Sequence, residues 1–203
     1  MARRNEHSRE ELREMALAAA EAILEEQGLD GLSTRKVAAR MGYTVGTLYL
    51  VFRNLDGLIL EVNGRTLAAL QQTLESSLAA TTDRPLAQRL KALARAYHDF
   101  ALCHPARWAL LYEHRSPDAA VPPWLSEAVH GLFALLEDLL QPLTGADPAT
   151  ALAARTLWGS VHGICVLAVT DKLDVAGPLE VDAAFASLID NYLTGLTAQD
   201  RGD

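Results

Sequence analysis

Apolar residues recur along much of the chain at steps of three and four positions, which is the spacing of one buried face of an α-helix. The first such run follows Ser8 and Glu11, whose types and spacing are those of a capping box at a helix start. Gly28 and Gly31 come after the run, and glycine commonly ends a helix. The pattern therefore predicts a first helix that stops near Gly28, with these apolar positions on its buried face: Leu12, Met15, Ala16, Ala19 and Ile23.

Two shorter helices are predicted next. Ser33 is suited to cap the first of them, which ends at Gly42, a residue that can adopt the left-handed conformation. The second begins after Thr44 and runs through Leu48 to Phe52. Two short helices joined by a tight turn are the arrangement of a helix-turn-helix, whose second helix enters the major groove of DNA.

Six further helical segments follow in the rest of the chain. Asn54 is suited to cap the first, and the pair His104–Pro105 separates the second from the third because a residue before proline disfavours the helical conformation. The segments cover about 55–78, 85–103, 106–112, 124–140, 148–169 and 179–196, and the fourth is expected to end before Pro142. No segment alternates as a strand does. The sequence thus predicts an all-α protein of about nine helices.

Charge at first argues against a nucleic-acid partner. The 203 residues carry 18 Lys and Arg against 26 Asp and Glu, a net charge of -8, whereas binding to phosphates depends on cationic side chains. The charge is unevenly distributed, however. Residues 1–60 hold eight basic and nine acidic residues, so nearly all of the net negative charge lies in residues 61–203. Residues 33–53 contain Arg35, Lys36, Arg40 and Arg53 and no acidic residue. A basic strip therefore lies inside an acidic chain.

Composition also bounds the location of the protein. Half of the residues are hydrophobic, and a chain of this length can bury a core in one or two domains. Its two cysteines suit a reducing compartment, and no apolar segment follows the basic residues at the N-terminus as a signal peptide would require. The longest stretch without Asp, Glu, Lys or Arg in the helical part, residues 156–170, is shorter than the roughly 20 residues of a membrane span. We expect a cytoplasmic protein with no membrane partner.

The predicted helix-turn-helix resembles that of the tetracycline-repressor (TetR) family of transcriptional regulators. The resemblance covers roughly residues 11–60 and depends on a glycine turn, Gly-Thr-Leu-Tyr at 46–49 and Phe-Arg-Asn at 52–54. It implies a three-helix DNA-binding domain at 1–54 and a helical effector-binding and dimerisation domain at 55–203.

The resemblance also implies which side chains meet DNA. Thr34, Thr47 and Tyr49 align with residues that commonly contact phosphates, whereas Arg35, Val45 and Gly46 align with residues that approach base edges. Independently of the family, hydroxyl groups suit phosphates, and arginine can bind guanine through two hydrogen bonds. The full predicted set is Thr34, Arg35, Thr44, Val45, Gly46, Thr47, Tyr49 and Arg53.

Some residues of this segment are not expected to contact DNA. Leu48 and Phe52 are one turn apart and are assigned to the core. Val51 and Leu55 stand at positions where the family commonly has His and Lys that contact phosphates. The expected electrostatic attraction to DNA is therefore weaker. Arg53, together with an N-terminal arm that carries Arg3 and Arg4, is a candidate to compensate.

The second half of the chain offers a candidate effector site. Trp158, His162 and Gly163 resemble the Trp-His-Gly signature of one C-terminal domain class in the family. Ligand pockets are apolar with a few placed polar groups. The candidate lining residues are Tyr97, Phe100, His104, Trp108, Tyr112, Phe133, Trp158 and His162. Aromatic residues at helical spacing are also ordinary core, so both interpretations stay open.

The sequence gives little support for a metal site, a redox site or a catalytic site. The histidines lack metal-ligand spacing, the two cysteines suit buried apolar positions better than a redox pair, and no nucleophile motif or phosphate loop occurs. We therefore expect no metal, no cofactor and no enzymatic activity. The interpretation is a transcriptional regulator, with repression favoured, that binds a palindromic DNA operator as a homodimer and is released by a small-molecule effector. Two alternatives remain: a helix-turn-helix regulator controlled by a protein partner or by no ligand, and a helical enzyme or interaction module.

Overall fold

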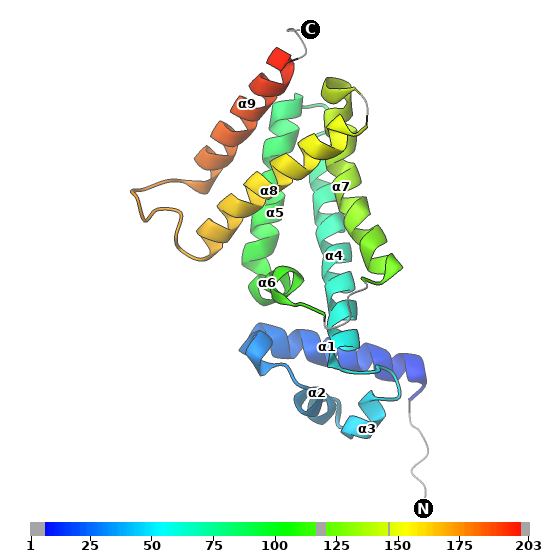
Figure 1. Ribbon diagram of the computed structural model, residues 1–203. Coiled ribbons are helices and arrows are strands. Elements are labelled where there is room, and N and C mark those ends of the chain that lie inside the picture. Colours follow the sequence, from blue (N-terminus) through cyan, green and yellow to red (C-terminus); the bar gives the residue numbers. More distant parts are fainter. Residues whose placement is uncertain (1–6, 117–120, 146, 200–203) are drawn as a thin grey trace, which may run out of the picture. The chain divides into compact units, whose positions relative to one another are not determined.

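The computed structural model describes residues 7–116, 121–145 and 147–199. These residues form nine α-helices and one short 3₁₀ helix and no strand, which confirms the all-α prediction (Figure 1). The helices are α1 (Arg9–Gln27), α2 (Thr34–Met41), α3 (Val45–Leu48), α4 (Leu55–Ala79), α5 (Leu86–Cys103), α6 (Pro105–Glu113), α7 (Pro123–Thr144), α8 (Ala149–Val169) and α9 (Val181–Gln199), and the 3₁₀ helix is Leu29–Gly31.

Local capping explains the predicted helix starts. The Ser8 hydroxyl accepts a hydrogen bond from the Glu11 backbone N–H at 3.2 Å, and the Glu11 carboxylate accepts one from the Ser8 N–H at 2.6 Å. These hydrogen bonds lower the pKa of the Glu11 carboxyl. At the start of α4, the Asn54 side chain accepts from the Gly57 N–H at 2.8 Å. The capping box and the Asn54 cap are therefore confirmed.

Three helix ends differ from the prediction by three or more residues, and one of them is that of α9, which runs to Gln199 instead of about residue 196. Helix α3 stops at Leu48 instead of Phe52, because Leu50 and Val51 donate to carbonyl groups three residues back and turn the chain more tightly than an α-helix does. Helix α7 continues through Pro142 to Thr144. Proline removes one backbone donor. The adjoining residues Leu139 and Leu140 are buried and hold this turn in place.

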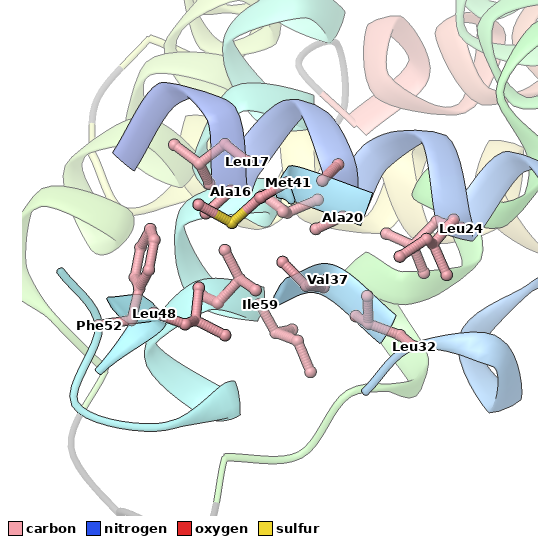
Figure 2. Packing of buried hydrophobic residues seen from close by; sticks show 14 of the residues in the cluster. Ala16, Leu17, Ala20, Leu24, Leu32, Val37, Met41, Leu48, Phe52 and Ile59 are labelled. Atoms are coloured by element: carbon pink, nitrogen blue, oxygen red, sulfur yellow. The ribbon is translucent and has the colours of Figure 1, made fainter. Parts of the chain in front are cut away.

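The chain divides into two compact units. The first contains the described residues within Met1–Leu67 and His104–Leu125, and the second those within Ala68–Cys103 and Ser126–Asp203. Figure 2 shows the core of the first unit, in which side chains of α1 meet Val37, Leu48 and Phe52. Leu110 of α6 is fully buried in the same core. Helices α2 and α3 are therefore supported by a core to which α6 contributes as well as their sequence neighbours.

The second unit is built on α5, α8 and α9. Phe185 and Ile189 of α9 are each 1% exposed and belong to its core. Ion pairs join α9 to α5: Lys91 Nζ lies 2.7 Å from the Asp190 carboxylate, and Arg95 lies 2.5 Å from Asp182. One face of α9 is thus held against α5 by apolar packing and charge.

Helix α8 has an unusually apolar surface. Among the described residues, it alone is long and apolar enough to cross a membrane by length and composition, a test that core helices of soluble proteins also pass. It nevertheless carries Arg155 and His162, and only 28% of its most apolar window is buried within the chain. Helix α8 therefore presents apolar surface that the described residues leave uncovered.

Candidate functional site

Helix α2 presents the first two predicted DNA-binding residues at its start. The Ser33 hydroxyl caps the helix by accepting from the Lys36 N–H at 3.3 Å, and Gly42 ends it in the left-handed conformation with φ 75° and ψ 23°. Thr34 is half-buried and Arg35 is exposed. Because Val37 is fully buried, the opposite face of α2 anchors it to the core.

Helix α3 carries the predicted base-reading positions. The Thr44 hydroxyl accepts from the Thr47 N–H at 3.3 Å and lies 3.2 Å from the Thr47 hydroxyl, so these two side chains organise the four-residue helix. Gly46 is exposed, and Val45 and Thr47 are half-buried. Leu48 is 1% exposed. The helix therefore turns its end inward and leaves its first turn accessible.

The turn after α3 separates core residues from candidate contacts. Phe52 is 3% exposed, which confirms the core assignment, while the Tyr49 side chain is 53% exposed and Arg53 is exposed. Val51 and Leu55, the two departures from the family pattern, are half-buried and pack against the core of the first unit. The apolar type at these two positions thus has a packing role.

The basic strip is smaller than the sequence count indicates. Arg40 binds the Glu26 carboxylate through two hydrogen bonds of 2.5 and 2.7 Å, which raises the pKa of Arg40 and lowers that of Glu26. Lys36 Nζ donates to the Gln27 side chain at 2.7 Å. Within the described ranges, Arg35 and Arg53 form no ion pair. Among the described residues of the strip, Arg40 alone is held in an ion pair, and Arg35, Lys36 and Arg53 remain cations available to a phosphate.

A contact that sequence reasoning missed lies beside the helix-turn-helix turn. His7 Nδ1 is 2.5 Å from the Tyr43 hydroxyl, and the two rings meet edge to face. No local signal links residues 36 positions apart. Arg3 and Arg4, the proposed arm, lie outside the described residues.

Four of the candidate effector residues gather in the second unit. The Tyr97 hydroxyl of α5 lies 2.9 Å from His162 Nδ1 of α8, and the His162 ring stacks on Trp158 at 5.2 Å between centroids. Phe133 of α7 meets Trp158 edge to face at 5.4 Å, and the Arg155 guanidinium lies over the Phe133 ring at 5.5 Å. Burial lowers the pKa of His162, so its neutral form is favoured. The cluster combines aromatic surface with a neutral polar pair.

The other four candidates lie elsewhere. Phe100 of α5 is buried in the second unit, whereas His104, Trp108 and Tyr112 belong to the first unit. Trp108 is 5% exposed and meets Tyr112 edge to face, and His104 Nδ1 lies 3.7 Å from a Glu25 carboxylate oxygen. That all eight residues share one pocket stays a prediction.

Sequence reasoning also missed a groove in the second unit, between the end of α7, the start of α8 and the end of α9. Its volume is about 550 Å³. The Tyr192 hydroxyl at its wall donates to the Ala153 carbonyl at 3.0 Å, and burial raises the pKa of Tyr192. The lining residues, none of which is Asp, Glu, Lys, Arg or His, are Leu143, Thr144, Ala149, Leu152, Ala153, Thr156, Asn191, Tyr192, Gly195 and Leu196.

Metal and cysteine chemistry gain no support from the geometry. Within the described ranges, no group of three or more His, Cys, Asp or Glu side chains could hold a metal ion. Cys165 is buried, which raises the pKa of its thiol to about 12, and Cys103 is exposed. At neutral pH Cys165 is therefore a protonated, unreactive thiol.

Comparison with known proteins gives matches over both halves of the chain. Residues 16–62 match a family model described as bacterial regulatory proteins, tetR family, and residues 90–192 match one described as tetracyclin repressor-like, C-terminal domain. The chain is 30% identical over 98 residues to the HTH-type transcriptional regulator Rv1816 of Mycobacterium tuberculosis, a match that spans 48% of this chain and 42% of that regulator.

Two further similarities cover nearly the whole chain. An uncharacterized HTH-type transcriptional regulator of M. tuberculosis, Rv0681, is 26% identical over 190 residues, which are 93% of this chain and 81% of the relative. A solved structure of a protein of unknown function from Rhodococcus sp. RHA1 has a TM-score of 0.76 and 28% identity, and the match covers 97% of this chain and all of the other.

Proposed function

The chain belongs to the tetR family of bacterial regulatory proteins, and from this premise we propose that it is a DNA-binding transcriptional regulator with repression as its mode of action. The observation that carries the proposal is the helix-turn-helix of α2 and α3, whose inner face is buried and whose outer face leaves Arg35, Gly46 and Tyr49 accessible. A protein that acts on bacterial DNA works in the cytoplasm. No enzymatic role is proposed.

The proposed contacts to DNA are of two kinds, to phosphates and to base edges. The hydroxyl groups of Thr34, Thr47 and Tyr49 bind phosphates and set the position of the protein, while Arg35 reads a guanine edge. Gly46, which has no side chain, lets the backbone of α3 approach the bases, and Val45 offers an apolar contact beside it. Arg53, exposed and without an ion pair among the described residues, adds a phosphate contact. Thr44 holds α3 in shape through its bonds to Thr47.

We infer that the protein acts as a homodimer joined through α8 and α9. Leu152 and Leu167 of α8 are 68% and 43% exposed, and a Cβ atom added at Gly159 or Gly163 would meet no atom within 4 Å. An uncharged groove, small residues and exposed leucines suit close helix packing across a two-fold axis. Two DNA-binding helices about one helical turn apart would then read a palindrome.

A small molecule bound in the second unit is proposed to release the operator. The cluster of Tyr97, Phe133, Trp158 and His162 supports this, since apolar rings around a few polar atoms are typical of ligand sites. Release requires that the ligand prefer a conformation in which the two DNA-binding units no longer match successive major grooves. A metabolite screen by thermal shift tests this, and a true ligand should lose its shift in Trp158→Ala.

The decisive experiment is selection of bound duplexes from a random DNA pool. We expect enrichment of a palindrome with half-sites about 10 base pairs apart between centres. Arg35→Ala should relax the preference at one position of each half-site, whereas the matched substitution Arg40→Ala should preserve the selected sequence because Arg40 is paired with Glu26. A pool that shows no enriched sequence would refute the proposed function.

A further inference from the structure

A half-buried polar cluster joins the end of α6 to the start of α4. His114 Nε2 donates to one Asp56 carboxylate oxygen at 2.6 Å, and the Ser116 hydroxyl donates to the other at 2.9 Å. The side chains of His114 and Asp56 are only 14% and 11% exposed. Both oxygens of a half-buried carboxylate are thus satisfied by residues 58 and 60 positions away in the sequence.

The ends of the two helices favour this arrangement. Asp56 lies in the first turn of α4, where the positive end of the helix dipole stabilises an anion, and Asn54 already caps that turn through the Gly57 N–H. His114 follows the last turn of α6, at the negative end of that helix dipole, and its ring N–H points to the Asp56 carboxylate. The hydrogen bonds therefore join two helix ends of complementary polarity.

Asp56 of this cluster lies shortly after the proposed DNA-contacting residues in the chain. Helix α3 has only four residues, too few to be stable alone, so its position depends on the segments that precede and follow it. Arg53 is three residues before Asp56, and Leu58 just after it is fully buried in the core that also holds Leu48. A shift of the first turn of α4 would therefore move Arg53 and the turn that ends α3.

We propose that Asp56, His114 and Ser116 are positioning residues for DNA binding, which hold the start of α4, and through it α3 and Arg53, in the conformation that fits the operator. This rests on the proposed DNA-binding function and deepens it. None of the three touches DNA in this proposal. Their loss lowers the fraction of molecules in the competent conformation, and the apparent affinity falls by the same factor.

The test compares operator affinity with affinity for unrelated DNA in the full-length protein, at a temperature where circular dichroism shows every variant folded. We expect Asp56→Asn and His114→Gln to weaken operator binding about tenfold and Ser116→Ala about threefold, as hydrogen bonds to a charged group are stronger than neutral ones. Affinity for unrelated DNA should stay within about twofold, because it depends on phosphate charge and not on precise fit.

Two controls separate positioning from other effects. Ser116→Thr keeps the hydroxyl and should restore operator affinity, which a loss of general stability would not predict. Asp83→Asn removes an exposed carboxylate in the turn after α4, in the second unit, and should leave both affinities unchanged. If removal of the Asp56 charge merely reduced repulsion of phosphates, Asp56→Asn would instead strengthen binding to both DNAs.

The possible failures are distinct. A wild-type protein that selects no operator contradicts the proposed function itself. A wild-type protein that binds its operator, with Ser116→Ala and His114→Gln variants that are folded and bind it equally well, overturns the positioning role alone. The positioning role is also overturned if the losses of operator affinity in Asp56→Asn and in His114→Gln simply add in the double variant. Two partners of one hydrogen bond should not act independently.

Discussion

The imidazole of His162 stacks on the indole of Trp158, one turn away on α8, with an angle of 16° between the ring planes. The Tyr97 hydroxyl approaches the same imidazole at Nδ1 from α5. Burial lowers the pKa of His162, since an imidazolium would lose hydration there. The resulting neutral ring can share a hydrogen bond with the Tyr97 hydroxyl.

His162 should make stability depend on pH in a defined direction. Because its pKa is lowered in the folded protein, the unfolded chain binds the proton first as pH falls below the ordinary value of about 6.5. The free energy of unfolding contributed by this site is therefore full above that pH and decreases below it. We expect the melting temperature of His162→Gln to fall less between pH 7.5 and 5.5 than that of the wild type.

The measurement is a pair of thermal melts for each protein in buffers of equal ionic strength. The difference between variant and wild type isolates His162 from the other histidines. Its size should be modest, because the partly exposed ring is screened by water. Parallel pH profiles for the two proteins would contradict the prediction.

Local sequence signals could predict most helix ends. Ser8 with Glu11, Asn54 and Gly42 act through neighbours within four residues, so the residue types alone are informative. The end of α3 was harder to predict, because the inward turn of Phe52 depends on the core built by α1. Helical periodicity identifies an apolar face but gives no indication of its partner.

The same difference between local and long-range contacts explains which parts of the candidate sites could be predicted. The helix-turn-helix could be predicted because its residues are consecutive in sequence. The place of α6 in the core of the first unit could not, since Leu110 joins a core that is otherwise built from residues 12–62, and the two partners of Asp56 lie 58 and 60 positions away. Likewise, a count of charges in the basic strip included Arg40 and could not reveal its partner Glu26.

The salt dependence of operator binding should separate the arginines of the strip. Arg53→Ala should reduce the slope of log affinity against log salt by about one per protomer, because it removes a phosphate contact that displaces a counterion. Arg35→Ala should change the slope less, because its proposed contact is to a base edge. Arg40→Ala should leave the slope nearly unchanged, since its guanidinium is held by Glu26. Equal slope changes for all three would show that the Glu26 pair opens on DNA.

Leu110 provides a test of the support that α6 gives to the first unit. It is fully buried in the core formed by α1, α2, α3 and the start of α4. Leu110→Ala should lower the free energy of unfolding by about 2–5 kcal/mol through lost burial and a residual cavity. The exposed Leu102, mutated to Ala, should change it by no more than about 0.5 kcal/mol. Equal melting midpoints for the two variants would contradict the assignment of α6 to this core.

Gly159 offers opposite expectations for folding and for dimerisation. It lies inside α8, and a Cβ atom there would meet no atom of its own chain within 4 Å. Gly159→Ala should therefore stabilise the helix by about 0.5–1 kcal/mol, as alanine is favoured over glycine in helix interiors.

If α8 packs closely on α8 or α9 of a second copy, Gly159→Leu should raise the dimer dissociation constant at least tenfold, because the side chain forces the helices apart. Sedimentation equilibrium measures the constant, and Ser76→Ala, an exposed substitution in α4, serves as the control for added helix propensity. An unchanged dissociation constant in Gly159→Leu would exclude this face of α8 from the dimer interface.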